Sequence, residues 1–139
     1  MLVSTIGNIV QFTICFLALW RGGRDERIVA AALLANTLAS KLAVSSDWVE
    51  PEYLVLVADM ALLTVLVTLA LRTTRWWVLW CAAFELLIVI THVAIVVDPT
   101  VRARSYVTGM IIWSYMVLLP LGFGAWETWR GAGRRQAPS

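Results

Sequence analysis

The sequence predicts an all-α membrane protein, a transmembrane bundle of five helices, and three observations lead to this prediction. The first is composition: of 139 residues, 60% are hydrophobic and only 14% are charged, with a mean hydropathy of +0.80. A soluble domain is typically about 45–50% apolar and about 25% charged. A chain this short cannot enclose so much apolar surface, so the excess must face lipid. The other two observations are the lengths of the apolar segments and the positions of the arginines.

Five apolar segments each approach the roughly 20 residues that a helix needs to cross the hydrocarbon core of a bilayer. They cover residues 2–20, 28–46, 53–71, 76–97 and 106–126, with short polar connections between them. They predict a single domain over residues 1–130, followed by a polar cytoplasmic tail over residues 131–139. The second segment is the weakest candidate because it contains Asn36 and Lys41.

The arginines support five spans and set the expected orientation. Loops on the cytoplasmic side of a membrane carry an excess of Lys and Arg. With five spans and the N-terminus outside, the inside segments contain Arg21, Arg24, Arg27, Arg72, Arg75, Arg130, Arg134 and Arg135, whereas the outside segments contain only Arg102 and Arg104. Removing the second span abolishes this asymmetry. We therefore expect the N-terminus outside and the C-terminus inside, in a multi-pass protein of the bacterial inner membrane.

Most of the tryptophans fall at the same predicted ends of the spans as the arginines. This group consists of Trp20, Trp76, Trp77, Trp80, Trp126 and Trp129. Indole side chains prefer the boundary between headgroups and hydrocarbon. We therefore interpret them as membrane anchors and not as the lining of a cofactor site.

Composition and spacing also exclude several classes of function. The net charge is only +2, from 11 basic and 9 acidic residues. The basic residues lie mostly in short loops, which suits a topology signal and not a nucleic-acid surface. Cys15 and Cys81 lie in apolar segments without metal-ligand spacing, so no metal site or disulfide framework is expected. His92 is the only histidine, which excludes haem bound by two histidines of one protomer. We predict no cofactor and no set of catalytic residues.

Seven polar residues within the predicted spans are the candidates for an intramembrane site. They are His92, Glu85, Asp59, Lys41, Asn8, Gln11 and Asn36. An ionisable residue at the centre of a membrane costs about 2.5–3.5 kcal/mol on insertion scales, which makes each one a candidate for function. One interpretation is a polar cavity open to the outside, with Asp59 able to pair with Lys41, Glu85 deeper, and His92 able to change charge near neutral pH. The alternative is that these groups bond to one another and only fix the helix packing.

The first and fourth spans carry polar stripes of matching spacing. Ser4, Asn8, Gln11 and Cys15 follow a 4-3-4 spacing, and so do Cys81, Glu85, Ile88 and His92. Such spacing keeps each set on one face of its helix. In antiparallel helices these sets align Asn8 with His92, Gln11 with Glu85, and Cys15 with Cys81. The sequence thus predicts that the first span packs beside the fourth.

Several short motifs resemble those of small Trp-rich bacterial membrane proteins that have no assigned activity. They are the stretch 76–80, the stretch 59–63, Thr91-His92, and the stretch 113–115. The resemblance spans most of the chain and implies a polytopic helical protein of the cell membrane.

Three functional hypotheses follow, and the first is favoured. It is a non-enzymatic role as an accessory or assembly subunit, or as a homo-oligomeric scaffold, in which lipid and other membrane proteins are the partners. The second is a minimal transporter or proton-coupled carrier that uses Glu85, His92, Asp59 and Lys41. The third is a small membrane enzyme acting on a lipid or quinone, with His92 and Glu85 as an acid–base pair.

Overall fold

The computed structural model describes residues 2–43, 53–97 and 103–135, and these residues form five α-helices. The helices are α1 (Leu2–Arg21), α2 (Arg24–Ala43), α3 (Tyr53–Arg72), α4 (Trp76–Val97) and α5 (Ala103–Arg135). The described part of the chain contains no β-strand. The predicted all-α class is therefore confirmed.

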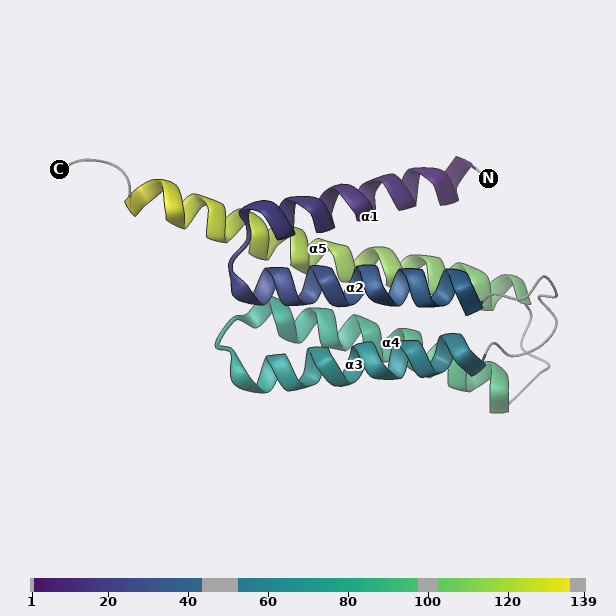
Figure 1. The fold of residues 1–139 in the computed structure, drawn as a ribbon. Helices are drawn as coiled ribbons and strands as arrows, with labels where there is room; N and C mark the ends of the chain where they lie inside the picture. The colour runs from purple at the N-terminus through teal and green to yellow at the C-terminus, as the bar shows by residue number, and fades with distance from the viewer. Residues whose placement is uncertain (1, 44–52, 98–102, 136–139) are drawn as a thin grey trace.

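The helices run side by side in alternating directions and form three layers (Figure 1). Helices α2 and α5 contact each other and make up the middle layer. Helix α1 packs on one side of this pair, and α3 and α4 pack together on the other side. Neighbours along the chain are also neighbours in space, and α5 closes the ring by contacting α1. Every helix is thus held by at least two others.

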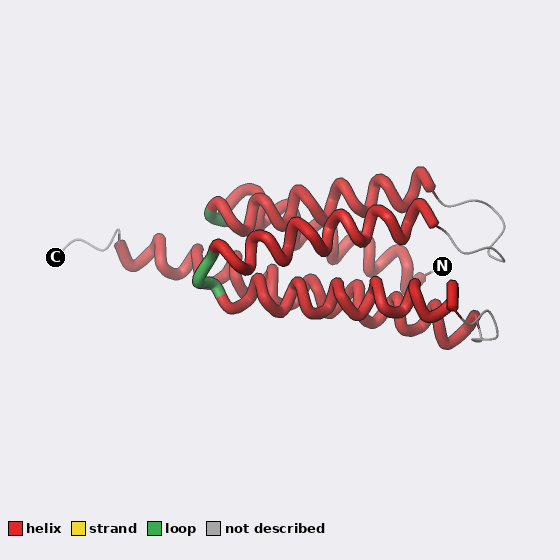
Figure 2. Tube along the Cα trace, turned by 90° about the horizontal axis from the view of Figure 1, so that it is seen from below, coloured by secondary structure: helices red, strands yellow, loops and turns green. Residues whose placement is uncertain are grey.

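The two short turns of the described chain lie at one end of the bundle, which we call the loop end (Figure 2). One turn joins α1 to α2 at Gly22 and Gly23, and the other joins α3 to α4 at residues 73–75. The amide of Gly22 donates a hydrogen bond to the carbonyl of Ala18 over 3.0 Å. A Cβ on Gly22 would collide with that carbonyl oxygen, so this position requires glycine. The arginines expected on one side of the membrane therefore share one end of the molecule.

Three helical segments of the described chain are long and apolar enough to cross a membrane: Tyr53–Arg72, Trp76–Val97 and Thr108–Gly131. In α1 the apolar segment Ile6–Arg21 is shorter than these three. Helix α2 is not one of the candidate spans. This result supports a membrane protein. It agrees with the expectation that the second span is the least apolar of the five.

Two helices extend beyond the limits expected for their spans. Helix α2 begins at Arg24, about one turn before residue 28, and α5 continues to Arg135, into the segment expected to be a polar tail. The expected limits mark where the chain ceases to be apolar, whereas a helix can continue through polar residues. Asp25 and Glu26 occupy the first turn of α2, where negative charge is favoured by the helix dipole.

The hydrophobic core lies at the centre of the bundle and includes one tryptophan that we expected at the membrane boundary. Trp77 is completely buried, and its side chain fills the space left by the absent side chain of Gly124 on α5. The prediction that all six tryptophans of the group are anchors is wrong for Trp77. Trp20, Trp76, Trp80, Trp126 and Trp129 are each about half exposed, as anchors would be.

The contact between Trp77 and Gly124 yields a stability prediction. A Cβ on Gly124 would lie 2.5 Å from the indole ring, so Gly124→Ala overpacks the core. Overpacking typically costs about 1–3 kcal/mol. We expect a lower midpoint in thermal unfolding of the detergent-solubilised protein.

Gly122→Ala is the matched control, since a Cβ there has Ile14 as its nearest neighbour at 3.9 Å. Both substitutions gain the same helix propensity, so only the contact with Trp77 separates them. Equal midpoints for the two variants would show that Trp77 is not tightly packed against α5.

Candidate functional site

A buried carboxylate joins three helices near the middle of the bundle. Asp59 on α3 accepts a hydrogen bond at Oδ1 from Nδ2 of Asn36 on α2 over 2.8 Å. Its other oxygen, Oδ2, lies 3.0 Å from Nε2 of His92 on α4. Asp59 and His92 are only 4% and 3% exposed. We call Asn36, Asp59 and His92 the Asp59 bridge.

Asp59 faces inward because it belongs to the buried stripe of α3. Val55, Asp59, Leu62 and Leu66 follow a 4-3-4 spacing and are the buried residues of this helix. This spacing keeps all four on one face. The apolar members of the stripe fix the rotation of α3, and that rotation directs Asp59 towards α2 and α4.

Glu85 is a second buried carboxyl group, about two helical turns from His92 on the buried face of α4. It is 1% exposed on the buried face of α4, and it is close enough to Asp59 for the two carboxyl groups to interact electrostatically. Its Oε1 has no hydrogen-bond partner among the described residues. Two carboxyl groups in a low dielectric repel each other when both are ionised. The site therefore combines the carboxylate of the Asp59 bridge with a second carboxyl group that has one unbonded oxygen among the described residues.

The other sequence candidates lie apart from the Asp59 bridge. Lys41 is exposed near the end of α2, with Nζ 5.5 Å from the ring centroid of Phe12 on α1. Asp59 is paired with His92 and Asn36 instead of with Lys41, so the expected pairing of Lys41 with Asp59 is wrong. Gln11 on α1 donates a short hydrogen bond to the Thr37 hydroxyl on α2.

The prediction that the first span packs beside the fourth is wrong. The backbones of α1 and α4 do not contact each other in the described chain, because α2 and α5 lie between them. The faces themselves were correctly identified: Cys81, Glu85, Ile88 and His92 are buried, Cys15 is buried, and Asn8 and Gln11 are half-buried. A polar stripe shows which face turns inward, but it does not identify the neighbouring helix.

A second polar cluster at the loop end was missed in the sequence. Glu26 on α2 is fully buried, and its Oε1 accepts hydrogen bonds from Nη1 of Arg75 over 2.8 Å and from Oγ1 of Thr128 on α5 over 2.7 Å. The neighbouring Asp25 accepts a hydrogen bond from Oγ1 of Thr73 over 2.8 Å. This loop-end cluster ties α2 and α5 to the turn between α3 and α4.

One signal for the loop-end cluster was present in the sequence. Glu26 precedes Val29, Ala30 and Leu33 at helical spacing, and all three are buried, so Glu26 continues the inward face of α2. Arg75 was interpreted only as a topology signal. No spacing rule connects it to Glu26 or Thr128, because they are far apart in the chain.

The structure indicates no metal centre in its described residues, where no three His, Cys, Asp or Glu side chains are placed to hold an ion. Cys15 and Cys81 are free, buried thiols within the hydrophobic core. The Sγ of Cys81 lies 3.6 Å from the carbonyl oxygen of Val117, to which it donates a weak hydrogen bond.

Comparison of the chain with models of protein families, with curated proteins and with solved structures finds no match. The resemblance to small Trp-rich bacterial membrane proteins therefore stays an expectation from short motifs. The geometry of the Asp59 bridge, of Glu85 and of the loop-end cluster is the basis for the function proposed below.

The loop-end cluster predicts a stability loss on removal of Arg75. Arg75→Met leaves the buried Glu26 carboxylate without its cationic partner, and breaking a buried ion pair in this way costs about 3–5 kcal/mol. We expect about 3 kcal/mol, at the lower end, because the Arg75 side chain is 38% exposed. Chemical unfolding in detergent, followed by tryptophan fluorescence, measures this difference.

Arg72→Met provides the control, since Arg72 is exposed at the same end of the bundle and has no carboxylate partner among the described residues. An exposed substitution of this kind changes stability by about 0.5 kcal/mol or less. The assignment fails if Arg72→Met destabilises the protein as much as Arg75→Met does.

Proposed function

We propose that this chain is a multi-pass protein of the bacterial inner membrane with a structural, non-enzymatic role. It acts as an accessory or assembly subunit, or as a homo-oligomeric scaffold. Its interior polar groups hold its own helices together, and its exposed apolar surface contacts lipid and partner helices. The single observation that carries this proposal is the Asp59 bridge, in which Asp59 contacts side chains from two other helices, and Asp59 and His92 are withdrawn from solvent.

Bonded polar groups between membrane helices act as packing contacts, each typically worth about 0.6–1.7 kcal/mol. A solute pathway instead requires polar side chains that converge on space a solute can enter. Asp59 and His92 are at most 4% exposed and are engaged with each other, while Lys41 lies at the surface beside α1. This separation favours the structural role over the four-residue carrier site expected from the sequence.

The exposed surface supports the proposal that this chain contacts lipid and partner helices. Large apolar side chains are exposed on every helix, among them Ile9, Phe16, Leu54, Leu79 and Leu119, each more than 60% exposed. In a bilayer this surface is covered by lipid or by other helices. A wild-type chain that purifies from mild detergent alone and as a monomer would contradict the subunit and scaffold roles.

A double-mutant cycle tests whether the Asp59 bridge is structural. Asp59→Leu and His92→Leu should each reduce the yield of assembled protein in size-exclusion chromatography, because each removes one side of a buried polar contact. The double variant should recover towards wild type, since replacing both partners by apolar groups of similar shape is nearly neutral. Losses that simply add in the double variant would show that the two side chains do not support each other.

We also propose five membrane spans, with the loop end in the cytoplasm. The concentration of arginines and exposed tryptophans at the loop end supports this orientation, because both residue types mark a membrane boundary and arginine marks its cytoplasmic side. Helix α2 crosses the membrane despite its polar residues because Glu26, Asn36 and Thr37 bond to neighbouring helices.

Reporter fusions test this arrangement. Fusions after Trp20, Ser46, Leu71 and Val97 should report inside, outside, inside and outside in turn. A cytoplasmic signal after Ser46 would reject the span formed by α2 and, with it, the five-span arrangement.

Glu85 supports a second candidate function, proton-coupled transport. A buried carboxyl group with an unbonded oxygen, next to a second carboxyl group, is the kind of intramembrane group found on proton pathways. In this function Glu85 takes up and releases the proton, and the nearby Asp59 and His92 complete the path.

Proton flux into proteoliposomes, measured with an enclosed pH-sensitive dye, tests this second function. Wild-type protein should increase the flux above that of empty vesicles, and Glu85→Gln should abolish the increase without reducing assembly, because the amide cannot exchange a proton. Glu127→Gln on the exposed side of α5 serves as the control and should retain the flux. Equal flux in the wild-type and Glu85→Gln vesicles would eliminate the carrier role.

A further inference from the structure

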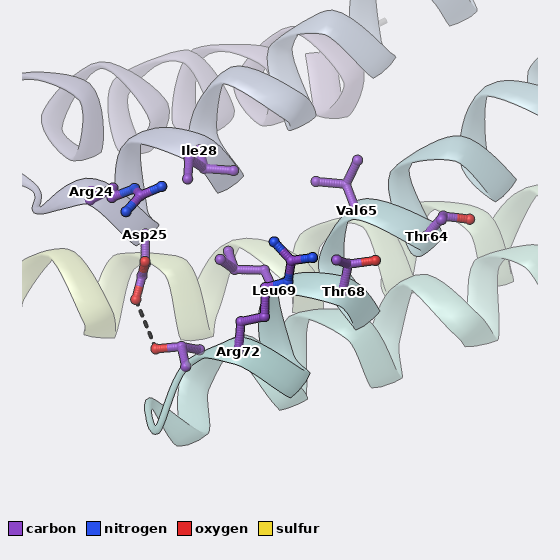
Figure 3. Close-up of a pocket in the computed structure, with 9 residues that line it drawn as sticks. Arg24, Asp25, Ile28, Thr64, Val65, Thr68, Leu69 and Arg72 are labelled. Atoms are coloured by element: carbon purple, nitrogen blue, oxygen red, sulfur yellow. Dashed lines mark hydrogen bonds between the residues drawn. The ribbon is translucent and has the colours of Figure 1, made fainter.

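A groove separates α2 from α3 at the loop end, and none of the residues of the Asp59 bridge or Glu85 lines it. It has a volume of about 510 Å³. Figure 3 shows Arg24 and Ile28 on α2, and Leu69 and Arg72 on α3, among the residues that line it. Along its length the groove is lined by three apolar side chains, Ile28, Val65 and Leu69, and by the threonines Thr64 and Thr68. At the loop end it is lined by two arginines and one acidic residue.

The two arginines of this groove have no ion-pair partner in the part of the chain that the structure describes. Neither Arg24 nor Arg72 forms an ion pair with a described residue, whereas the neighbouring Arg75 is bonded to Glu26. Asp25 is the acidic residue that lines the groove, and its Oδ2 already accepts from Thr73 and lies 4.0 Å from Nε of Arg75. Two arginines that line one groove and form no ion pair with a described residue favour binding of an anion there.

The groove also changes polarity along its length. Arg24, Asp25, Arg72 and Thr73 are at the loop end, and Thr64 lies two turns further along α3, a distance of about 12 Å at 1.5 Å per residue. The Thr64 hydroxyl donates to the Met60 carbonyl of its own helix over 2.8 Å and is therefore satisfied. The arginines at the loop end and the apolar side chains further along complement a phospholipid, which has an anionic headgroup and apolar acyl chains.

The side of the groove formed by α3 faces the surroundings of the bundle. Val65, Thr68 and Arg72 are exposed, and α3 is one of the segments apolar enough to cross a membrane. A molecule in the plane of the bilayer can thus enter from the side. Free phosphate could use the arginines, but it would leave the apolar part of the groove uncovered.

We infer that this groove binds one anionic phospholipid, with its phosphate between Arg24 and Arg72 and an acyl chain along Ile28 and Val65. The inference rests on the membrane location of α3 and not on the assembly role. It could hold if the subunit role fails, and it could fail if the subunit role holds.

The test measures binding of phosphatidylglycerol, phosphatidylcholine and inorganic phosphate to the full chain in a neutral detergent, by native mass spectrometry. Removing one arginine near a phosphate typically weakens binding about fivefold. Arg24→Gln and Arg72→Gln should therefore each weaken phosphatidylglycerol binding about fivefold, and the double variant should weaken it about 25-fold. Thr68→Trp fills the exposed side of the groove while keeping both charges, and it should also weaken phosphatidylglycerol binding. Phosphatidylcholine should bind weakly to all variants.

Arg21→Gln is the control, because Arg21 is at the same end of the molecule and stacks over Trp20 with its guanidinium 5.0 Å from the ring centroid. It should bind phosphatidylglycerol like the wild type. Any of three results overturns the inference: wild-type affinity in the Arg24→Gln/Arg72→Gln double variant, an equal loss in Arg21→Gln, or displacement of the lipid by inorganic phosphate at equal concentration. A thermal midpoint equal to that of wild type establishes that each variant is folded before its binding is compared.

Discussion

The bundle is organised around one buried carboxylate that is bonded to two other helices. Asp59 connects α3 to α2 through Asn36 and to α4 through His92. In an apolar interior an unpaired carboxylate is expensive, so the three helices must keep a rotation and a depth at which all three side chains meet. Apolar contacts alone would tolerate small rotations or sliding of the helices. The bridge therefore selects one arrangement among several of similar packing quality, which is the role that bonded polar groups can serve between membrane helices.

The same constraint explains the layers. Because α2 must present Asn36 to α3, it occupies the middle of the bundle beside α5, and α1 remains outside, held through Gln11 and Thr37. Helix α2 is the least apolar helix of the bundle for this reason. Three of its polar side chains, Glu26, Asn36 and Thr37, bond to other helices, whereas Arg24 and Lys41 are exposed. Hydropathy adds the residues of a segment without regard to direction, so it underestimates a helix whose polar groups face inward.

At the loop end, arginines that look equivalent in the sequence serve different purposes. Arg75 neutralises the buried Glu26 and joins the turn between α3 and α4 to α2 and α5. Arg21 stacks over Trp20 at the surface, and Arg24 and Arg72 line a groove and form no ion pair with any described residue. Topology rules treat all of these residues alike because they count charge and not contacts. The difference between them arises from which helices meet, and it separates a stabilising ion pair from a cationic surface available to an anion.

The sequence by itself determined the helical class, the apolar segments, the alternating direction of successive helices and the inward faces of α1 and α4. These features depend on composition and on spacing within one helix. It also identified Asp59, Glu85, His92 and Asn36 as polar residues that must be accommodated in an apolar region. Only the tertiary structure decided that α3 and α5, and not α1, lie next to α4. It also decided that His92 and not Lys41 is the partner of Asp59, and that Trp77 is in the core. The physical reason is that periodicity defines a face, whereas the neighbour of that face depends on which helices pack best together. That choice involves residues distant in the chain, whose mutual distances no local pattern contains.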